Sequence, residues 1–160
     1  SKHPDAQFHI IGPCLDGMYL SVLQGLIRDF KLESNVSFLG SVSDEELIWQ
    51  MSHARGLVMP SINKDGHFEG FGLVHLEAQA LGTPSIGSFD CGNEEVIQNG
   101  DTGFLVNQRD LVGLSQAMLY FLEDDKFKIM SKNATKSVRS YSWDKTVREY
   151  VKGYRRCLDI

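Results

Sequence analysis

The spacing of hydrophobic positions changes several times along the chain, and these changes predict alternating strands and helices. Short apolar runs bounded by polar or glycine residues predict strands at 7–12, 36–40, 57–59, 85–88 and 103–106. Apolar residues three and four positions apart predict helices at 18–30, 43–53 and 72–81. Ser43 and Glu46 form a capping box at the start of the second helix. This order predicts an α/β fold with a Rossmann-like parallel sheet and helices on both faces.

The last third of the sequence has helical spacing. Two apolar faces follow the last strand, and a further helix is expected to begin at Ser142. The apolar positions are Leu111, Leu114, Met118 and Phe121 on the first face and Phe127, Met130 and Ala134 on the second. We expect these faces to belong to the core rather than to a site.

The composition fits one globular domain. The chain has 160 residues, 42% of them hydrophobic, which is enough to bury one core. Its net charge of −5 and the lack of a basic run argue against nucleic acid as a partner. The three cysteines are widely spaced without a C-x-x-C pair, which argues against zinc and against disulfides and favours a cytoplasmic compartment. No apolar run approaches the roughly 18 residues of a transmembrane segment.

The helix at 72–81 carries a candidate ligand-binding carboxylate, Glu77. We expect Glu77 to lie on the inward face of this helix, among its apolar positions. Those positions are Leu73, Leu76, Ala80 and Leu81. A buried carboxylate is unfavourable unless a partner binds it, and acidic residues hold ribose hydroxyls in dinucleotide sites. This pattern therefore predicts that Glu77 binds a nucleotide.

The segment before this helix is rich in glycine. Gly70 and Gly72 flank Phe71, and without a Cβ they let the backbone approach a ligand closely. The N–H groups of residues 70–73 stand at the positive end of the helix, where we expect them to face a pyrophosphate. Glu69 comes directly before these amides.

The run from Glu69 to Glu77, E-G-F-G-L-V-H-L-E, resembles the E-x7-E motif of retaining GT-B glycosyltransferases, most closely glycosyltransferase family 4, also called group 1. The similarity extends to both sides of the motif. Pro60-Ser61 ends the preceding strand as in the family, and residues 36–40 are similar to its V-x-F-L-G strand. Residues 77–84 match E-A-x-A-x-G-x-P, and residues 95–106 match E-V-I-x-x-G-x-T-G-F-L-V. The matched segments follow the family's order.

The resemblance implies roles for the residues around the first glutamate. Glu69 would be the catalytic residue, in contact with the donor sugar near the reacting centre. Gly70, Phe71, Gly72 and Leu73 would donate backbone amides to sugar hydroxyls and to the diphosphate, while the Phe71 ring packs. A simpler alternative for Glu69 is that its carboxylate only complements the dipole of the helix.

Other residues are implied to lie near the nucleotide. Gly12 ends the first strand, and Val42 lies in a loop whose backbone meets the base in the family. Lys64 and His67, in a loop that looks longer than the family's usual form, are weaker candidates, because loop side chains of this kind are generally solvated. His75 is expected to be structural or exposed.

The resemblance also implies parts that are not found in this sequence. Family members open the domain with a strand ending in Gly-Arg, a lysine and a helix, and a separate N-terminal domain binds the acceptor. Residues 1–160 would then form a single nucleotide-sugar-binding domain that lacks its first strand-helix unit and is inactive alone. We expect the missing strand to lie between 7–12 and 57–59. In the family the terminal helix often crosses back to the other domain.

The expected function is that of the donor-binding domain of a retaining glycosyltransferase. Such an enzyme transfers a hexose from a nucleoside-diphosphate sugar to a saccharide, lipid or other acceptor, in the cytoplasm or peripherally at the inner face of the membrane. The family is metal-independent and the sequence has no Asp-x-Asp cluster, so we expect neither metal nor cofactor. Two alternatives stay open: a non-catalytic nucleotide-binding module, and a GT-B-type epimerase or phosphorylase.

Overall fold

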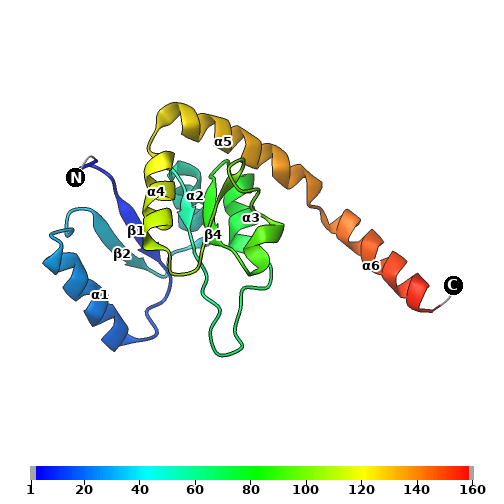
Figure 1. Cartoon of the computed structure of the whole chain (residues 1–160), viewed down its shortest axis with the longest axis horizontal. Coiled ribbons are helices and arrows are strands. Elements are labelled where there is room, and N and C mark those ends of the chain that lie inside the picture. Colours follow the sequence, from blue (N-terminus) through cyan, green and yellow to red (C-terminus); the bar gives the residue numbers. More distant parts are fainter. Residues whose placement is uncertain (1–2, 159–160) are drawn as a thin grey trace. The chain divides into compact units, whose positions relative to one another are not determined.

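The computed structural model describes residues 3–158, and these residues form two compact units (Figure 1). The first unit ends at Leu47 and the second begins at Ile48. The single domain predicted for 1–160 stays a prediction.

The first unit contains a β-α-β arrangement. Strand β1 (Phe8–Ile11) leads through helix α1 (Gly17–Asp29) to strand β2 (Val36–Gly40), and the strands pair in parallel from Phe8–Val36 to Ile11–Gly40. The Asp16 carboxylate caps α1 by accepting the amides of Met18 and Tyr19. Helix α2 (Asp44–His53) continues into the second unit, and the Ser43 hydroxyl accepts the Glu46 amide as the capping box predicted.

The second unit is built on a three-stranded parallel sheet. Its strands are β3 (Leu57–Val58), β4 (Ser85–Ser88) and β5 (Gly103–Val106), in the order β3-β4-β5. Helix α3 (Leu73–Ala80) connects β3 to β4, and the 3-10 helix η1 (Gly92–Glu95) follows β4. After β5 come α4 (Leu111–Phe121), α5 (Asp124–Ser137), the 3-10 helix η2 (Val138–Ser140) and α6 (Trp143–Cys157).

The predicted α/β class and the parallel pairing of the strands are confirmed. The described strands form two separate sheets, β1-β2 and β3-β4-β5. A strand joins a sheet only where its backbone groups meet those of a neighbouring strand, and β3 forms its ladder with β4 alone. The additional strand that the resemblance implies between them stays a prediction.

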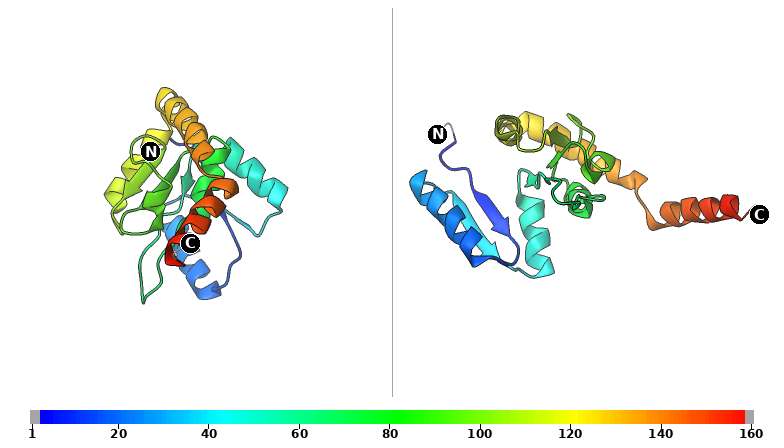
Figure 2. Two further views of the ribbon diagram at one scale, coloured as in Figure 1. Left: turned by 90° about the vertical axis from the view of Figure 1, so that its right-hand side faces the viewer. Right: turned by 60° about the horizontal axis from the view of Figure 1, so that its bottom comes forward.

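The core of the second unit lies between β4, β5 and the helices α4 and α5. Its buried members are Ile86, Val106, Ala117, Phe121 and Met130. Successive residues of a strand point to opposite faces, so Gly87 of β4 points away from this cluster, toward Ile97 and Asn93. Figure 1 shows α3 and α4 on opposite sides of β4, and Figure 2 shows the same helices from two other directions.

The predicted inward face of α3 is wrong. Its buried residues are His75, Ala78 and Gln79, whereas Leu73 is 62% exposed and Glu77 is also exposed. Hydrophobic spacing suggested the opposite face, but α3 packs against β4 and against Asn93 of η1, where small and polar side chains fit. The argument for Glu77 from the cost of a buried carboxylate therefore does not hold.

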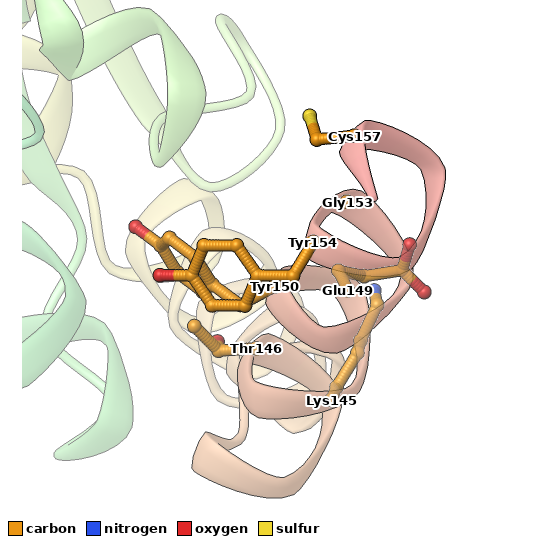
Figure 3. A pocket seen from close by; sticks show the side chains of 7 residues that line it. All are labelled: Lys145, Thr146, Glu149, Tyr150, Gly153, Tyr154 and Cys157. Atoms are coloured by element: carbon orange, nitrogen blue, oxygen red, sulfur yellow. The ribbon is translucent and has the colours of Figure 1, made fainter. Parts of the chain in front are cut away.

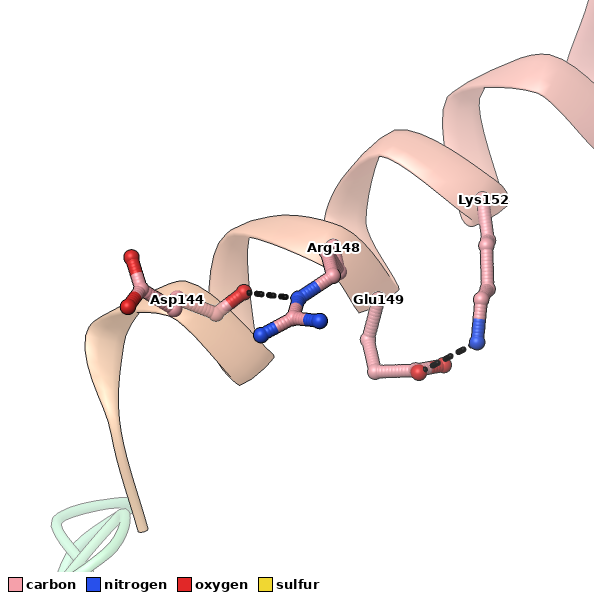
Figure 4. Close-up of polar contacts among 4 residues, drawn as sticks. All are labelled: Asp144, Arg148, Glu149 and Lys152. Carbon is pink, nitrogen blue, oxygen red and sulfur yellow. Dashed lines mark hydrogen bonds and ion pairs between the residues drawn. The ribbon is translucent and has the colours of Figure 1, made fainter.

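Helix α6 has an exposed apolar stripe and an exposed polar face. The stripe consists of Trp143, Val147, Tyr150, Val151, Tyr154 and Leu158, between 39% and 83% exposed. On the polar face, Arg148 donates to the Asp144 carbonyl (3.1 Å) and Lys152 to the Glu149 carboxylate (2.7 Å) (Figure 4). The Lys152 ammonium group lowers the pKa of Glu149. The crossing of this helix to another domain stays a prediction.

A surface hollow of about 590 Å³ lies against α6 (Figure 3). Residues of this helix line it, with Tyr150 and Tyr154 pointing to one side. It includes none of the site residues predicted from the sequence. Within residues 3–158, no helix has both the length and the apolar character needed to cross a membrane.

Candidate functional site

The loops that follow β3, β4 and β5 are tied together by side-chain hydrogen bonds. Asn63, after β3, donates its Nδ2 to the Asp90 carbonyl (2.8 Å), and its backbone N–H to Oε1 of Gln108 (2.8 Å). Gln108, after β5, donates to the Phe89 carbonyl (3.0 Å). In parallel sheets the carboxyl ends of the strands are where ligands bind. The candidate site therefore stands on a linked set of loops.

A short hairpin extends from the first of these loops. Lys64 and His67 exchange two backbone hydrogen bonds of 3.0 and 2.8 Å around Asp65 and Gly66. Both central residues have positive φ angles, 52° and 79°, as in the tight turns that fit the twist of a hairpin. The side chains of Lys64 and His67 are exposed, and Lys64 lies 3.9 Å from the Asp65 carboxylate. Their contact with a ligand stays a prediction.

The segment from Glu69 to Leu73 forms a turn that enters α3, here called the glycine turn. Its backbone lies directly against Gly92 of η1, which donates its N–H to the Glu69 carbonyl (2.7 Å). A Cβ on Gly92 would come within 2.2 Å of the Gly70 carbonyl group and 2.4 Å of the Phe71 nitrogen. Glycine at position 92 therefore allows the loops after β3 and β4 to touch through their backbones.

Gly72 caps α3 in the left-handed conformation, with φ 81° and ψ 55°. Its N–H donates to Oε1 of Glu69 (3.0 Å), so the expectation that all amides of residues 70–73 are free is wrong for Gly72. This hydrogen bond satisfies one of the donors that a helix start leaves unpaired. For the amides of Gly70, Phe71 and Leu73, the described residues provide no acceptor. Three neighbouring donors thus remain at the helix start.

The Glu69 carboxylate is half-buried and holds the turn with Oε1. The carboxylate lies at the start of α3, where it could also complement the helix dipole, and within residues 3–158 no hydrogen bond involves Oε2. The hydrogen bond from the Gly72 amide fixes the Glu69 carboxylate beside the free amides of Gly70, Phe71 and Leu73. Its catalytic role stays a prediction.

Phe71 packs, as the sequence predicted for its ring. The ring meets that of Tyr141 edge to face, with centroids 6.2 Å apart. The Tyr141 hydroxyl donates to the Glu95 carbonyl at the end of η1. Burial raises the pKa of Tyr141, and the negative charge of Glu95 raises it further. The Phe71 side chain thus anchors the turn and leaves the Phe71 amide available.

The other predicted site residues are less closely assembled. Glu77 is exposed on α3, about one helical turn after the glycine turn. Gly12 and Val42 belong to the first unit, where Gly12 follows β1 with φ 141° and donates to the Gly40 carbonyl (2.9 Å). Val42 is half-buried in the loop before α2. The place of Gly12 and Val42 in a common site with Glu69 stays a prediction.

Two residues that the sequence did not suggest for the site, His75 and Asn93, lie beneath the glycine turn. Both are fully buried. Burial lowers the pKa of His75 from its ordinary 6.5 to about 4, against the charge of Glu69, which favours the protonated ring. The Met59 carbonyl and the Asn93 side chain also favour protonation, but neither meets full hydrogen-bond geometry with the ring. His75 is therefore neutral near pH 7. The Gly92-Asn93 pair, a turn signal before the matched segment at 95–106, is the only hint in the sequence.

Among residues 3–158, no group of three or more histidine, cysteine, aspartate or glutamate side chains is placed to hold a metal ion. Whether the chain works without a metal or cofactor stays a prediction. What the site does offer is a row of free amides at a helix start and a fixed carboxylate, an arrangement that suits an anionic ligand.

A parallel sheet with helices on both sides, and with its candidate site at the carboxyl ends of the strands, defines a Rossmann-like α/β domain. The profile of a single protein family, described as "Glycosyl transferases group 1", matches residues 1–137. The chain belongs to this family. The resemblance seen in the sequence is thereby confirmed.

Relatives and solved structures agree with this assignment. The chain is 32% identical over 159 residues to D-inositol 3-phosphate glycosyltransferase of Corynebacterium urealyticum, covering 96% of this chain and 36% of that protein. It is 36% identical over 126 residues to GDP-mannose-dependent monoacylated alpha-(1-6)-phosphatidylinositol monomannoside mannosyltransferase of Corynebacterium glutamicum, covering 78% of this chain and 32% of that protein. The chain thus spans about a third of the length of these curated relatives.

The fold is shared with a solved structure, that of HepE from Anabaena in complex with UDP-glucose. The TM-score is 0.78 at 25% identity, over 96% of this chain and 42% of that one. The GT-B class of fold is confirmed by this likeness.

Proposed function

We propose that this chain binds the nucleoside-diphosphate sugar of a retaining hexosyltransferase. One observation carries the proposal: the glycine turn presents the free amides of Gly70, Phe71 and Leu73 beside a carboxylate that is already fixed by a hydrogen bond. Backbone donors at a helix start are suited to a diphosphate.

Each group of the turn has a proposed role. The free amides bind the diphosphate, which gains charge as it leaves the sugar. Glu69 interacts with the sugar carbon from which the diphosphate departs, and its interaction strengthens as positive charge develops there. Glu77 receives the ribose hydroxyls from its exposed position on α3. In the whole enzyme, another part of the protein supplies the acceptor.

The names of the relatives support the class of donor and leave its base open. One relative is named as GDP-mannose-dependent, and the Anabaena neighbour was solved with UDP-glucose. Both donors join a hexose to a nucleoside diphosphate, which fits the proposal.

Calorimetry tests the proposal with UDP, GDP, ADP, UDP-glucose and GDP-mannose. We expect one base to bind best, and saturation at 100 times Kd to raise the free energy of unfolding by about 2.7 kcal/mol. Glu77→Gln should raise the Kd about tenfold, because a charge-assisted hydrogen bond is replaced by a neutral one. Asp125→Asn is the matched control, since it removes the same charge from an exposed position at the start of α5.

The outcomes separate the proposal from its alternatives. Absence of binding by every nucleotide in the panel would contradict the proposal. Binding without any transfer by the whole enzyme would favour a non-catalytic module. Formation of a hexose 1-phosphate or of an epimer of the donor would favour a phosphorylase or an epimerase.

A further inference from the structure

A pair of unpaired polar side chains lies under the glycine turn. His75 and Asn93 are each 0% exposed. Within the described part of the chain, neither ring nitrogen of His75 has a hydrogen-bond partner, and neither polar atom of the Asn93 amide has one. Native proteins leave few buried polar groups unpaired, so each such group calls for an explanation.

Both side chains lie directly against Gly72. A Cβ on Gly72 would come within 2.8 Å of Oδ1 of Asn93 and within 2.8 Å of Cδ2 of His75. Asn93 also reaches β4, because a Cβ on Gly87 would lie 2.8 Å from its Nδ2. The pair therefore fills the space between the sheet and the turn, and it forms the surface on which Gly72 rests.

Gly72 in turn fixes the functional groups of the proposed site. Its N–H holds Oε1 of Glu69 (3.0 Å), and its carbonyl accepts the His75 amide (3.0 Å). A shift of Gly72 would move both the carboxylate and the start of α3. The side chains of His75 and Asn93 thus act on the site without touching a ligand.

Stability gives no reason for these two residue types. A buried donor or acceptor without a partner destabilises the fold, whereas apolar side chains of similar shape would not. Residues that lower stability are found where function requires a particular local geometry.

We propose that His75 and Asn93 are positioning residues that hold the glycine turn, and with it Glu69, in the geometry required for donor binding. This inference rests on the proposed function. It adds that the polar pair serves the shape of the turn and not the stability of the domain.

The test compares His75→Leu with Gln79→Leu. Leucine at position 75 fills the space without polar atoms. Gln79 is the matched control because it is also 0% exposed on the same face of α3, has an unpaired Oε1, and lies one turn further from Gly72. The measurements are the urea midpoint, hydrogen exchange of the Gly72 amide without ligand, and the Kd for UDP and GDP.

We expect His75→Leu to unfold at the same or a higher urea concentration than the parent chain. Its Gly72 amide should exchange about tenfold faster, because the hydrogen bond from this amide to the Glu69 carboxylate is loosened. Its Kd for the preferred nucleotide should also rise about tenfold, because the amides of the glycine turn are then displaced from the diphosphate. Gln79→Leu should change neither the exchange nor the Kd. Asn93→Ser should repeat the effects of His75→Leu on the Gly72 exchange and on the Kd, although the cavity that it leaves lowers the urea midpoint. It replaces His75→Leu if that variant does not fold.

A lower urea midpoint with unchanged Gly72 exchange would overturn the inference and make the pair ordinary core residues. Faster exchange with an unchanged Kd would overturn it as well, since the turn would then move without consequence for the donor. If the parent chain binds no nucleotide, the proposed function fails, and the exchange rates still decide whether the pair holds the turn.

Discussion

Gly92→Ala should destabilise the second unit strongly, because it inserts a methyl group between two backbone segments. The added Cβ would lie 2.2 Å from the carbon and oxygen of the Gly70 carbonyl and 2.4 Å from the Phe71 nitrogen. Carbon atoms normally stay about 3.5–4.0 Å apart, so the overlap exceeds about 1 Å. The obstructing atoms are backbone, and Gly92 is held to the Glu69 carbonyl (2.7 Å), so neither side can turn away.

Overpacking of this kind costs about 1–3 kcal/mol of unfolding free energy. With an m-value of about 2 kcal/mol per molar urea, the midpoint should fall by about 1 M. Circular dichroism during urea unfolding measures the shift. Gly70→Ala is the control from the same contact: its φ is not in the left-handed region, no atom lies within 4 Å of its ideal Cβ, and its effect should stay within about 0.5 kcal/mol. Equal midpoints for the two alanine variants would refute the close contact between the loops.

Three further predictions concern the same site. Glu69→Gln keeps an acceptor for the Gly72 amide, so its free energy of unfolding should stay within about 0.5 kcal/mol of the parent while sugar transfer by the whole enzyme falls sharply. Glu69→Ala should lose transfer and also about 1 kcal/mol of unfolding free energy. Full transfer by the glutamine variant would contradict the catalytic role of Glu69. Because burial lowers the pKa of His75 from 6.5 to about 4, acid protonates the unfolded chain first, and stability should fall by about 3 kcal/mol between pH 6.5 and 4. Urea unfolding at several pH values should show a smaller loss of stability in His75→Leu than in the parent chain. Identical pH curves for the two proteins would rule out His75 as the source of the loss. Asn63→Ala removes the bond to the Asp90 carbonyl and should cost about 1 kcal/mol, measured by thermal unfolding, whereas no change would show that the loops hold without it.

The local elements of this chain could be predicted well. Strands at 36–40, 85–88 and 103–106 have the predicted bounds, and the third helix differs from its prediction by one residue at each end. Short apolar runs between glycine and polar residues are local signals, because they depend on the alternation of side chains along one strand. The order of these elements, together with the motif from Glu69 to Glu77, was sufficient to indicate the family.

The packing of those elements could not be predicted from the spacing of hydrophobic residues alone. The buried face of α3 was predicted wrongly because periodicity records which residues are apolar, while burial depends on the neighbour that a face meets. That neighbour is β4, where Gly87 leaves room for Asn93, and the face that fits it carries His75 and Gln79.

The amino-acid sequence alone established the α/β class, the succession of strands and helices, and the glycine-rich start of α3 between two glutamates, because each of these follows from neighbouring residues along the chain. The tertiary structure decided that Gly92 touches the glycine turn, that the Glu69 carboxylate takes the Gly72 amide, and that His75 and Asn93 are buried below it. The contacts of Gly92 and Asn93 with the glycine turn join the loops after β3 and β4 across 20 or more positions, as in the bond from Gly92 to Glu69. Only the parallel pairing of the strands brings such distant residues to the same edge of a sheet.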